Sequence, residues 1–170
     1  ITQNDTQEPA DGVGKFRDMV EIYNSGDKAL PLRGLTPDDS VALTGEAFPV
    51  PETDDGSPGD FWTFRGAAFA TIPARGYLVL FLNNRPDPSQ WCEPYSGFGL
   101  KDDGSEPITL WGPVTGTDED GNKIREKIDE VWLPPLPKDV SLGRKPEDPG
   151  PALVTPEDTF KHFRLYPPGH

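Results

Sequence analysis

The sequence has only one cysteine, one methionine and two histidines among its 170 residues. The single cysteine, Cys92, excludes a disulfide bond within the chain and a structural zinc site built from four cysteines. No run of about 18 apolar residues occurs, which is the length that a membrane-spanning helix requires. The chain opens at Ile1 without a signal peptide or an initiator methionine, which we interpret as an excised domain or a processed mature form.

Apolar residues are scarce, at 34% of the chain, but nine phenylalanines, four tryptophans and four tyrosines supply large apolar surfaces. The sequence is rich instead in proline and glycine, with 21 and 18 residues. Because proline is rarely tolerated inside helices or central strands, this composition indicates many loops and short strands. We therefore expect a single all-β domain that spans residues 1–170.

Acidic residues outnumber basic ones by 29 to 16, which gives a formal net charge of −13 at pH 7. A field of this sign opposes binding to nucleic acid and to anionic membranes. It is compatible with cationic partners, with divalent cations, or simply with a well-solvated surface. We therefore expect no nucleic-acid partner and no insertion into a membrane.

A strand pattern is clearest in the segment DMVEIYN, where Val20 and Ile22 lie on one face and Glu21 and Tyr23 on the other. Asn24 and the residues after it then supply turn chemistry. Similar short segments recur, and turn signals separate them at intervals of roughly 8–12 residues. This plan predicts a β-sandwich of about seven to nine short strands with long loops rich in proline and glycine.

Three later segments carry more specific expectations. The most apolar run, residues 77–82, predicts a central strand buried on both faces. Residues 124–131 contain good helix formers, but their apolar anchors are too few for a helix, so we predict a strand. The proline-rich tail, residues 145–170, predicts an irregular extension packed on the core, although the alternation in residues 159–166 would also suit a last edge strand.

Six short motifs follow one another in a recognisable order: residues 18–24, 30–35, 72–80, 98–110, 129–131 and 139–144. The first contains a version of the pattern IELYN, and the third a version of L-x-P-G-x-Y-L-V-L. The order resembles that of bacterial lamin tail domains, and the resemblance covers residues 1–144. The sequence departs from the family pattern at Leu35, where the family has tryptophan.

The resemblance implies an immunoglobulin-like β-sandwich without enzymatic activity. Its implied role is that of an interaction or architectural module in an exported bacterial protein, secreted or at the cell surface, which binds a protein or surface partner. An alternative is a carbohydrate- or calcium-binding accessory domain of a larger extracellular enzyme.

The best candidates for metal ligands are Asp118, Asp120 and Asn122, since oxygen atoms at alternate positions can bind calcium. As an EF-hand loop the segment fails, because glycine falls at the fourth position and Asp129 occupies the place of the final glutamate. An Asp-Gly-Asn sequence also makes an ordinary hairpin turn. We favour the turn and keep calcium as the alternative.

A catalytic triad would need a nucleophile, a histidine and an orienting acid. Both histidines, His162 and His170, lie in the tail, and no Gly-x-Ser-x-Gly segment occurs. Cys92 beside His162 would support a hydrolase, but a lone cysteine is more often an inert small hydrophobe. We therefore expect no enzymatic activity and no cofactor other than the calcium alternative.

Aromatic residues in loops are the remaining candidates for a binding site. Trp91 lies in a proline-rich loop with Tyr95 close by, and such a pair can stack on a sugar ring or anchor a protein partner. The alternative is that the tryptophans close the ends of the sandwich core.

Overall fold

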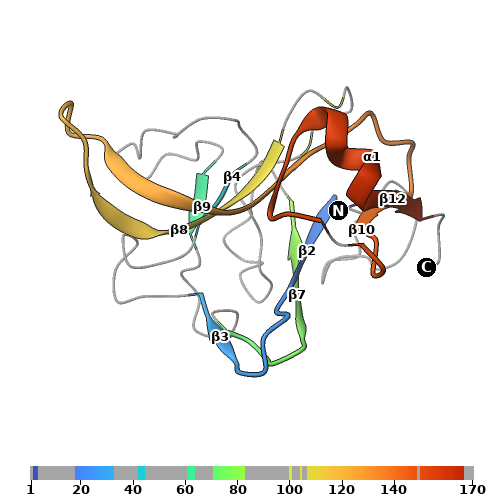
Figure 1. Ribbon diagram of the computed structural model, residues 1–170, viewed down its shortest axis with the longest axis horizontal. Helices are drawn as coiled ribbons and strands as arrows, with labels where there is room; N and C mark the ends of the chain where they lie inside the picture. The colour runs from blue at the N-terminus through green and yellow to red at the C-terminus, as the bar shows by residue number, and fades with distance from the viewer. Residues whose placement is uncertain are drawn as a thin grey trace, which may run out of the picture.

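The fold is broadly all-β, as the composition predicts, and the described residues lie mostly in strands with one short α-helix. A computed structural model describes residues 2–3, 18–32, 42–44, 61–63, 71–82, 100, 104, 107–148 and 150–166. These residues form two five-stranded sheets and one two-stranded sheet. Figure 1 shows the long β8–β9 hairpin curving away at one end, with α1 and β12 at the other.

The first sheet runs in the order β12-β10-β1-β2-β7. Its strands are β12 (Phe163–Tyr166), β10 (Val140–Arg144), β1 (Thr2–Gln3), β2 (Met19–Tyr23) and β7 (Tyr77–Phe81). All neighbours in this sheet pair antiparallel. The predicted strand after Asp18 is therefore confirmed as β2, which lies beside β7 over its whole length.

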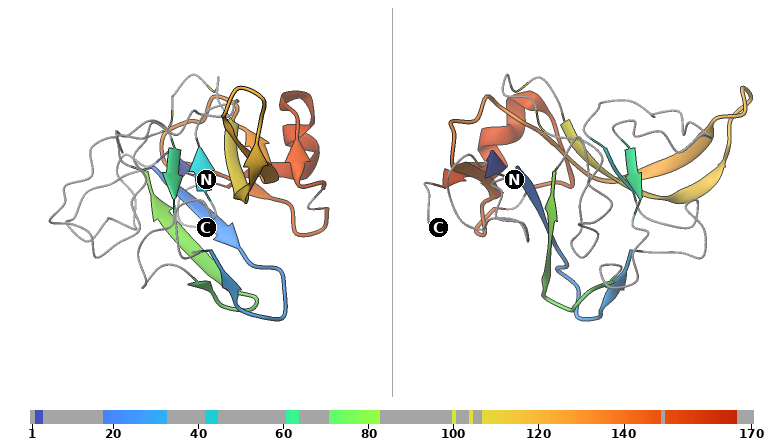
Figure 2. Two further views of the ribbon diagram at one scale, coloured as in Figure 1. Left: turned by 90° about the vertical axis from the view of Figure 1, so that its left-hand side faces the viewer. Right: turned by 180° about the vertical axis from the view of Figure 1, so that it is seen from behind.

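The second sheet runs in the order β11-β9-β8-β4-β5, and the third pairs β3 with β6. These strands are β11 (Leu153–Val154), β9 (Lys123–Trp132), β8 (Pro107–Thr117), β4 (Ala42–Thr44), β5 (Phe61–Thr63), β3 (Leu30–Pro31) and β6 (Thr71–Ile72). The strand predicted within residues 124–131 is confirmed as part of β9. Irregularities in the β8–β9 ladder add twist to this hairpin, which projects beyond the other strands in the right-hand view of Figure 2.

One hydrophobic core joins residues from all three sheets. Its buried members in the described part of the chain are almost all aliphatic, and Phe163 is the aromatic exception. Alternation along each strand supplies these side chains: Val20 is buried in β2, while its neighbour Glu21 is exposed. Phe81 and Trp111 are buried as well, so aromatic side chains also contribute to the described interior.

The prediction of a strand at residues 77–82 is confirmed as β7, but the predicted burial on both faces does not hold for the first residues of the strand. Within the described residues β7 lies at the end of its sheet and pairs with β2 alone. Tyr77 is 58% exposed, whereas Leu80 and Phe81 are buried. The apolar run therefore has two parts: it begins at solvent with Tyr77, and its last residues enter the core.

The prediction of an irregular tail is also wrong for the described residues after Arg144. The tail contains β11, a 3₁₀-helix η3 (Pro156–Asp158), α1 (Thr159–His162) and β12. β11 pairs parallel with β9, and β12 forms the edge of the first described sheet. The edge strand suggested for residues 159–166 is therefore confirmed for residues 163–166, whereas residues 159–162 form α1. The tail thus completes both large sheets.

Arg144 in β10 links the first sheet to the start of β11. Its guanidinium bonds the carboxylate of Asp129 in β9 and donates to the carbonyls of Pro151 (2.9 Å) and Ala152 (3.1 Å). It also lies over the Phe163 ring, 4.7 Å from the centroid. Burial raises the pKa of Asp129 above its ordinary value, and the charge of Arg144 opposes that rise.

Gly150 tests whether the tail is docked as described. Its φ of +67° is in the left-handed region, and a Cβ atom there would overlap the imidazole of His162. Gly150→Ala should therefore lower the free energy of unfolding by at least about 2 kcal/mol, measured by urea denaturation. Gly116→Ala is the matched control, because a Cβ at Gly116 meets nothing within 4 Å. Equal stability of the two variants would contradict the docked tail.

Candidate functional site

The connection from β2 to β3 meets the connection from β6 to β7 at one corner of the molecule, at the bottom of Figure 1. We call residues 24–28 and 73–76 the corner. Asn24 N–H donates to the Gly76 carbonyl (2.9 Å), and Arg75 N–H donates to the Gly26 carbonyl (3.1 Å). These bonds hold the two connections against each other where both of them leave the first sheet.

The buried side chain of Asn24 organises this corner. Its Nδ2 group lies within hydrogen-bonding distance of three carbonyl oxygens, those of Lys28 (2.8 Å), Ile72 (3.1 Å) and Pro73 (3.0 Å). Its Oδ1 atom accepts from Gly26 N–H (3.0 Å). Asn24 is only 6% exposed, so its buried amide obtains its hydrogen bonds from the backbone rather than from water. The sequence indicated a turn here but gave no sign of bonds to the distant segment.

Tyr23 and Tyr77 stand side by side immediately next to the corner. They face each other directly in the β2–β7 register, with ring centroids 4.6 Å apart and an angle of 31° between the ring planes. Tyr23 is 47% exposed and Tyr77 is 58% exposed. We call them the tyrosine pair. Such cross-strand aromatic pairs stabilise a sheet, and this one also presents two large rings to solvent.

The residues next along the same face are Glu21 and Val79, which also oppose each other in the register. Glu21 is exposed and Val79 is partly buried. One step further, Phe81 opposes Met19 and is only 8% exposed. The exposed apolar strip therefore begins at the tyrosine pair and ends before Phe81, with one carboxylate beside it.

The aromatic pair predicted from the sequence, Trp91 and Tyr95, lies outside the described residues, as does Cys92. Among the described residues the structure brings together another aromatic pair, Tyr23 and Tyr77. His162 is described: its Nδ1 atom lies 3.4 Å from Asp148 Oδ1, and its ring packs against Gly150. These neighbours belong to the docked tail.

Asp118 uses its carboxylate within the predicted turn between β8 and β9. Its Oδ1 atom accepts from the N–H groups of Asp120 (3.0 Å) and Asn122 (2.8 Å), and its Oδ2 atom accepts from Asn122 Nδ2 (3.0 Å). The side-chain and backbone bonds from Asn122 lead the effects that hold the pKa of Asp118 below its ordinary value. The geometry therefore favours the hairpin turn, and calcium binding at Asp118, Asp120 and Asn122 stays a prediction.

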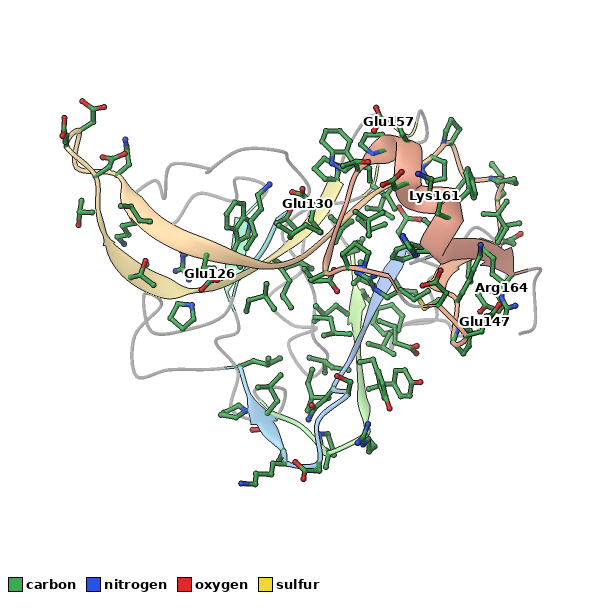
Figure 3. The ribbon with its side chains drawn as sticks, in the orientation of Figure 1. Glu126, Glu130, Glu147, Glu157, Lys161 and Arg164 are labelled. Carbon is green, nitrogen blue, oxygen red and sulfur yellow. The ribbon has the colours of Figure 1, made fainter. Side chains whose placement is uncertain are left out.

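Glu130 is the centre of a second polar group, at the base of the β8–β9 hairpin (Figure 3). Its Oε2 atom accepts from Thr109 Oγ1 (2.9 Å) and from Lys127 Nζ (2.5 Å), and Lys127 also lies over the Trp111 ring. The carboxylate is thus neutralised and hydrogen-bonded by its own sheet. A partly buried carboxylate needs such partners, and those of Glu130 indicate a structural role within the sheet.

The described residues show neither a metal-binding cluster nor a membrane-spanning helix. They contain no group of three or more His, Cys, Asp or Glu side chains placed to hold a metal ion. They also contain no helix long and apolar enough to cross a membrane.

Comparisons with known proteins add no assignment. No protein-family model matches the sequence, and no curated protein and no solved structure matches it either. The lamin-tail resemblance therefore stays a prediction.

Asn24→Asp tests the corner directly. The substitution preserves shape but replaces the donating Nδ2 group with a carboxylate oxygen that faces three carbonyls. We expect the free energy of unfolding to fall by at least about 3 kcal/mol in urea denaturation at pH 7. Asn24→Ala, which removes the donors without adding charge, should cost less. A loss below about 0.5 kcal/mol for Asn24→Asp would contradict the described role.

The turn at Asp118 should respond to pH. A lowered pKa means that the ionised carboxylate stabilises the folded turn above the ordinary value of 3.8, and that this stabilisation is lost as the pH falls through the lowered value. The amide hydrogen exchange of Asn122, corrected for intrinsic rates, should therefore rise only in that acidic range. Asp118→Asn should abolish the pH-dependent step, whereas Glu119→Gln should leave it unchanged. The same step in both variants would contradict this assignment.

Proposed function

We propose that this protein is a non-catalytic interaction module of an exported bacterial protein, with an immunoglobulin-like β-sandwich fold of the lamin-tail type. Two five-stranded sheets that contribute to one core support this fold. The motif at residues 18–24 forms β2 and reaches the corner at Asn24, while the motif at residues 139–144 contains β10. These two motifs thus fall on strands of one sheet.

The tyrosine pair is the observation that carries the proposed function. A solvent-exposed aromatic pair is costly to leave in water, and tyrosine is enriched where proteins bind their partners because it joins a large apolar ring to a polar hydroxyl. The hydrogen bonds of the corner fix the strands that carry both rings. A rigid surface of this kind loses little conformational entropy when a partner binds.

Calcium binding at the acidic turn has less support as a function. The Asp118 carboxylate already accepts three N–H bonds, and a calcium ion would have to compete with those donors. A calcium-dependent rise in melting temperature that Asp118→Ala abolishes would overturn this ranking.

Co-sedimentation with cell envelopes from the source organism tests the proposed function. The variant Tyr23→Ser/Tyr77→Ser should bind envelopes at least about tenfold more weakly than the wild-type protein, because both rings are removed. Phe160→Ser is the matched control, since Phe160 is 54% exposed and lies on α1. Equal binding by the tyrosine variant and the wild-type protein, with both folded by circular dichroism, would contradict the proposal.

A further inference from the structure

The exposed strip around the tyrosine pair is narrow and short. It comprises two half-exposed rings and the partly buried Val79, and it stops where Phe81 becomes buried. A tyrosine ring covers 150–250 Å² when fully buried, so this strip offers on the order of 200–300 Å² of apolar surface. A stable protein–protein interface buries about 1,200–2,000 Å² in total. The strip therefore suits a ligand of a few rings better than a folded protein partner.

The groups around the strip suit a ligand that is apolar on its face and polar at its edge. Glu21 lies one step along the same face of β2, and its carboxylate can only accept hydrogen bonds when ionised. The hydroxyls of both tyrosines can donate and accept. A sugar ring has this character, since its faces present C–H groups and its rim carries hydroxyls.

The net charge of the protein restricts the class of ligand further. A net charge of −13, with Glu21 beside the rings, repels anionic chains. Neutral sugars are unaffected by this repulsion, and their hydroxyls can donate to the Glu21 carboxylate. The site therefore favours neutral glycans over uronic-acid or sulfated polymers.

We propose that the tyrosine pair and Glu21 form a binding site for a neutral oligosaccharide segment. One or two sugar units stack on the exposed rings of Tyr23 and Tyr77, and Glu21 accepts hydrogen bonds from their hydroxyls. The buried Asn24 amide is a positioning group, because it fixes the strands without contacting the sugar. The inference rests on the proposed function, since it names the ligand class of the same surface.

Affinity electrophoresis in native gels tests the site. The probes are hydroxyethylcellulose, xylan, galactomannan and glycogen as neutral polymers, with alginate as the anionic comparison. We expect at least one neutral polymer to retard the wild-type protein and alginate not to retard it. Tyr77→Ala and Glu21→Gln should each weaken that retardation, the former by about tenfold, which corresponds to 1.4 kcal/mol. Tyr77→Phe should retain most of it, since the ring remains, and Phe160→Ala should retain all of it.

Three results would overturn the oligosaccharide site: no neutral polymer retards the protein, alginate retards it more strongly, or Tyr77→Ala is retarded as strongly as the wild type. A second experiment distinguishes failure of the oligosaccharide site from failure of the proposed function. In it, a protein that carries a photo-cross-linking residue at position 77 is mixed with cell envelopes and irradiated. A protein adduct without polysaccharide retardation would overturn the sugar ligand and leave the interaction module standing. Neither adduct nor retardation would overturn both.

Discussion

A single buried amide holds together the part of the structure on which the proposed site depends. Asn24 bonds the carbonyls of Ile72 and Pro73, which lie far from it in the sequence, and so fixes where two chain segments leave the first sheet. Both segments then continue into β3 and β6, which pair with each other. No other neutral side chain of this size offers both the donors and the acceptor that this corner uses. The tyrosine pair lies directly next to this corner, at the last register position of β2 and β7.

Several charged side chains of the described tail region are paired with neighbours in the same region or in β9. Arg144 bonds Asp129 and two carbonyls of the chain before β11, and Lys145 donates to the last carbonyls of α1 at Phe160 (2.9 Å) and Lys161 (2.7 Å). Arg164 lies 3.4 Å from Glu147, and Figure 3 shows the two side by side. These contacts attach the tail to β9 and β10 through polar groups as well as through buried apolar side chains such as Val154 and Phe163.

The sequence allowed the strands with clear alternation to be predicted, because period two is a local property. β2 is of this kind. β9 was predicted because residues 124–131 hold too few apolar anchors for a helix, and the turn at Asp118 was predicted from its Asp-Gly-Asn sequence. The position of β7 was not predictable, since a continuous apolar run marks burial of some of its residues without showing which neighbours cover the others. The tail was obscured by its prolines, which permit short strands at a sheet edge.

The candidate site was harder to predict than the fold. Trp91 and Tyr95 drew attention because they are close in the sequence, whereas Tyr23 and Tyr77 become neighbours only through the register of two distant strands. The signal available was the alternation itself: it placed Tyr23 on the outer face with Glu21, opposite to Val20. A prediction that β2 and β7 pair would have been needed to complete the site.

Hydrogen exchange of asparagine side-chain amides, read by NMR together with contacts between the tyrosine rings, tests the central claim most directly. The account predicts that the Nδ2 protons of Asn24 exchange much more slowly than those of the exposed Asn122, and that nuclear Overhauser effects connect the rings of Tyr23 and Tyr77. Exchange at the same rate for both asparagines, with no effect between the two rings, would contradict the buried corner and the surface that it positions.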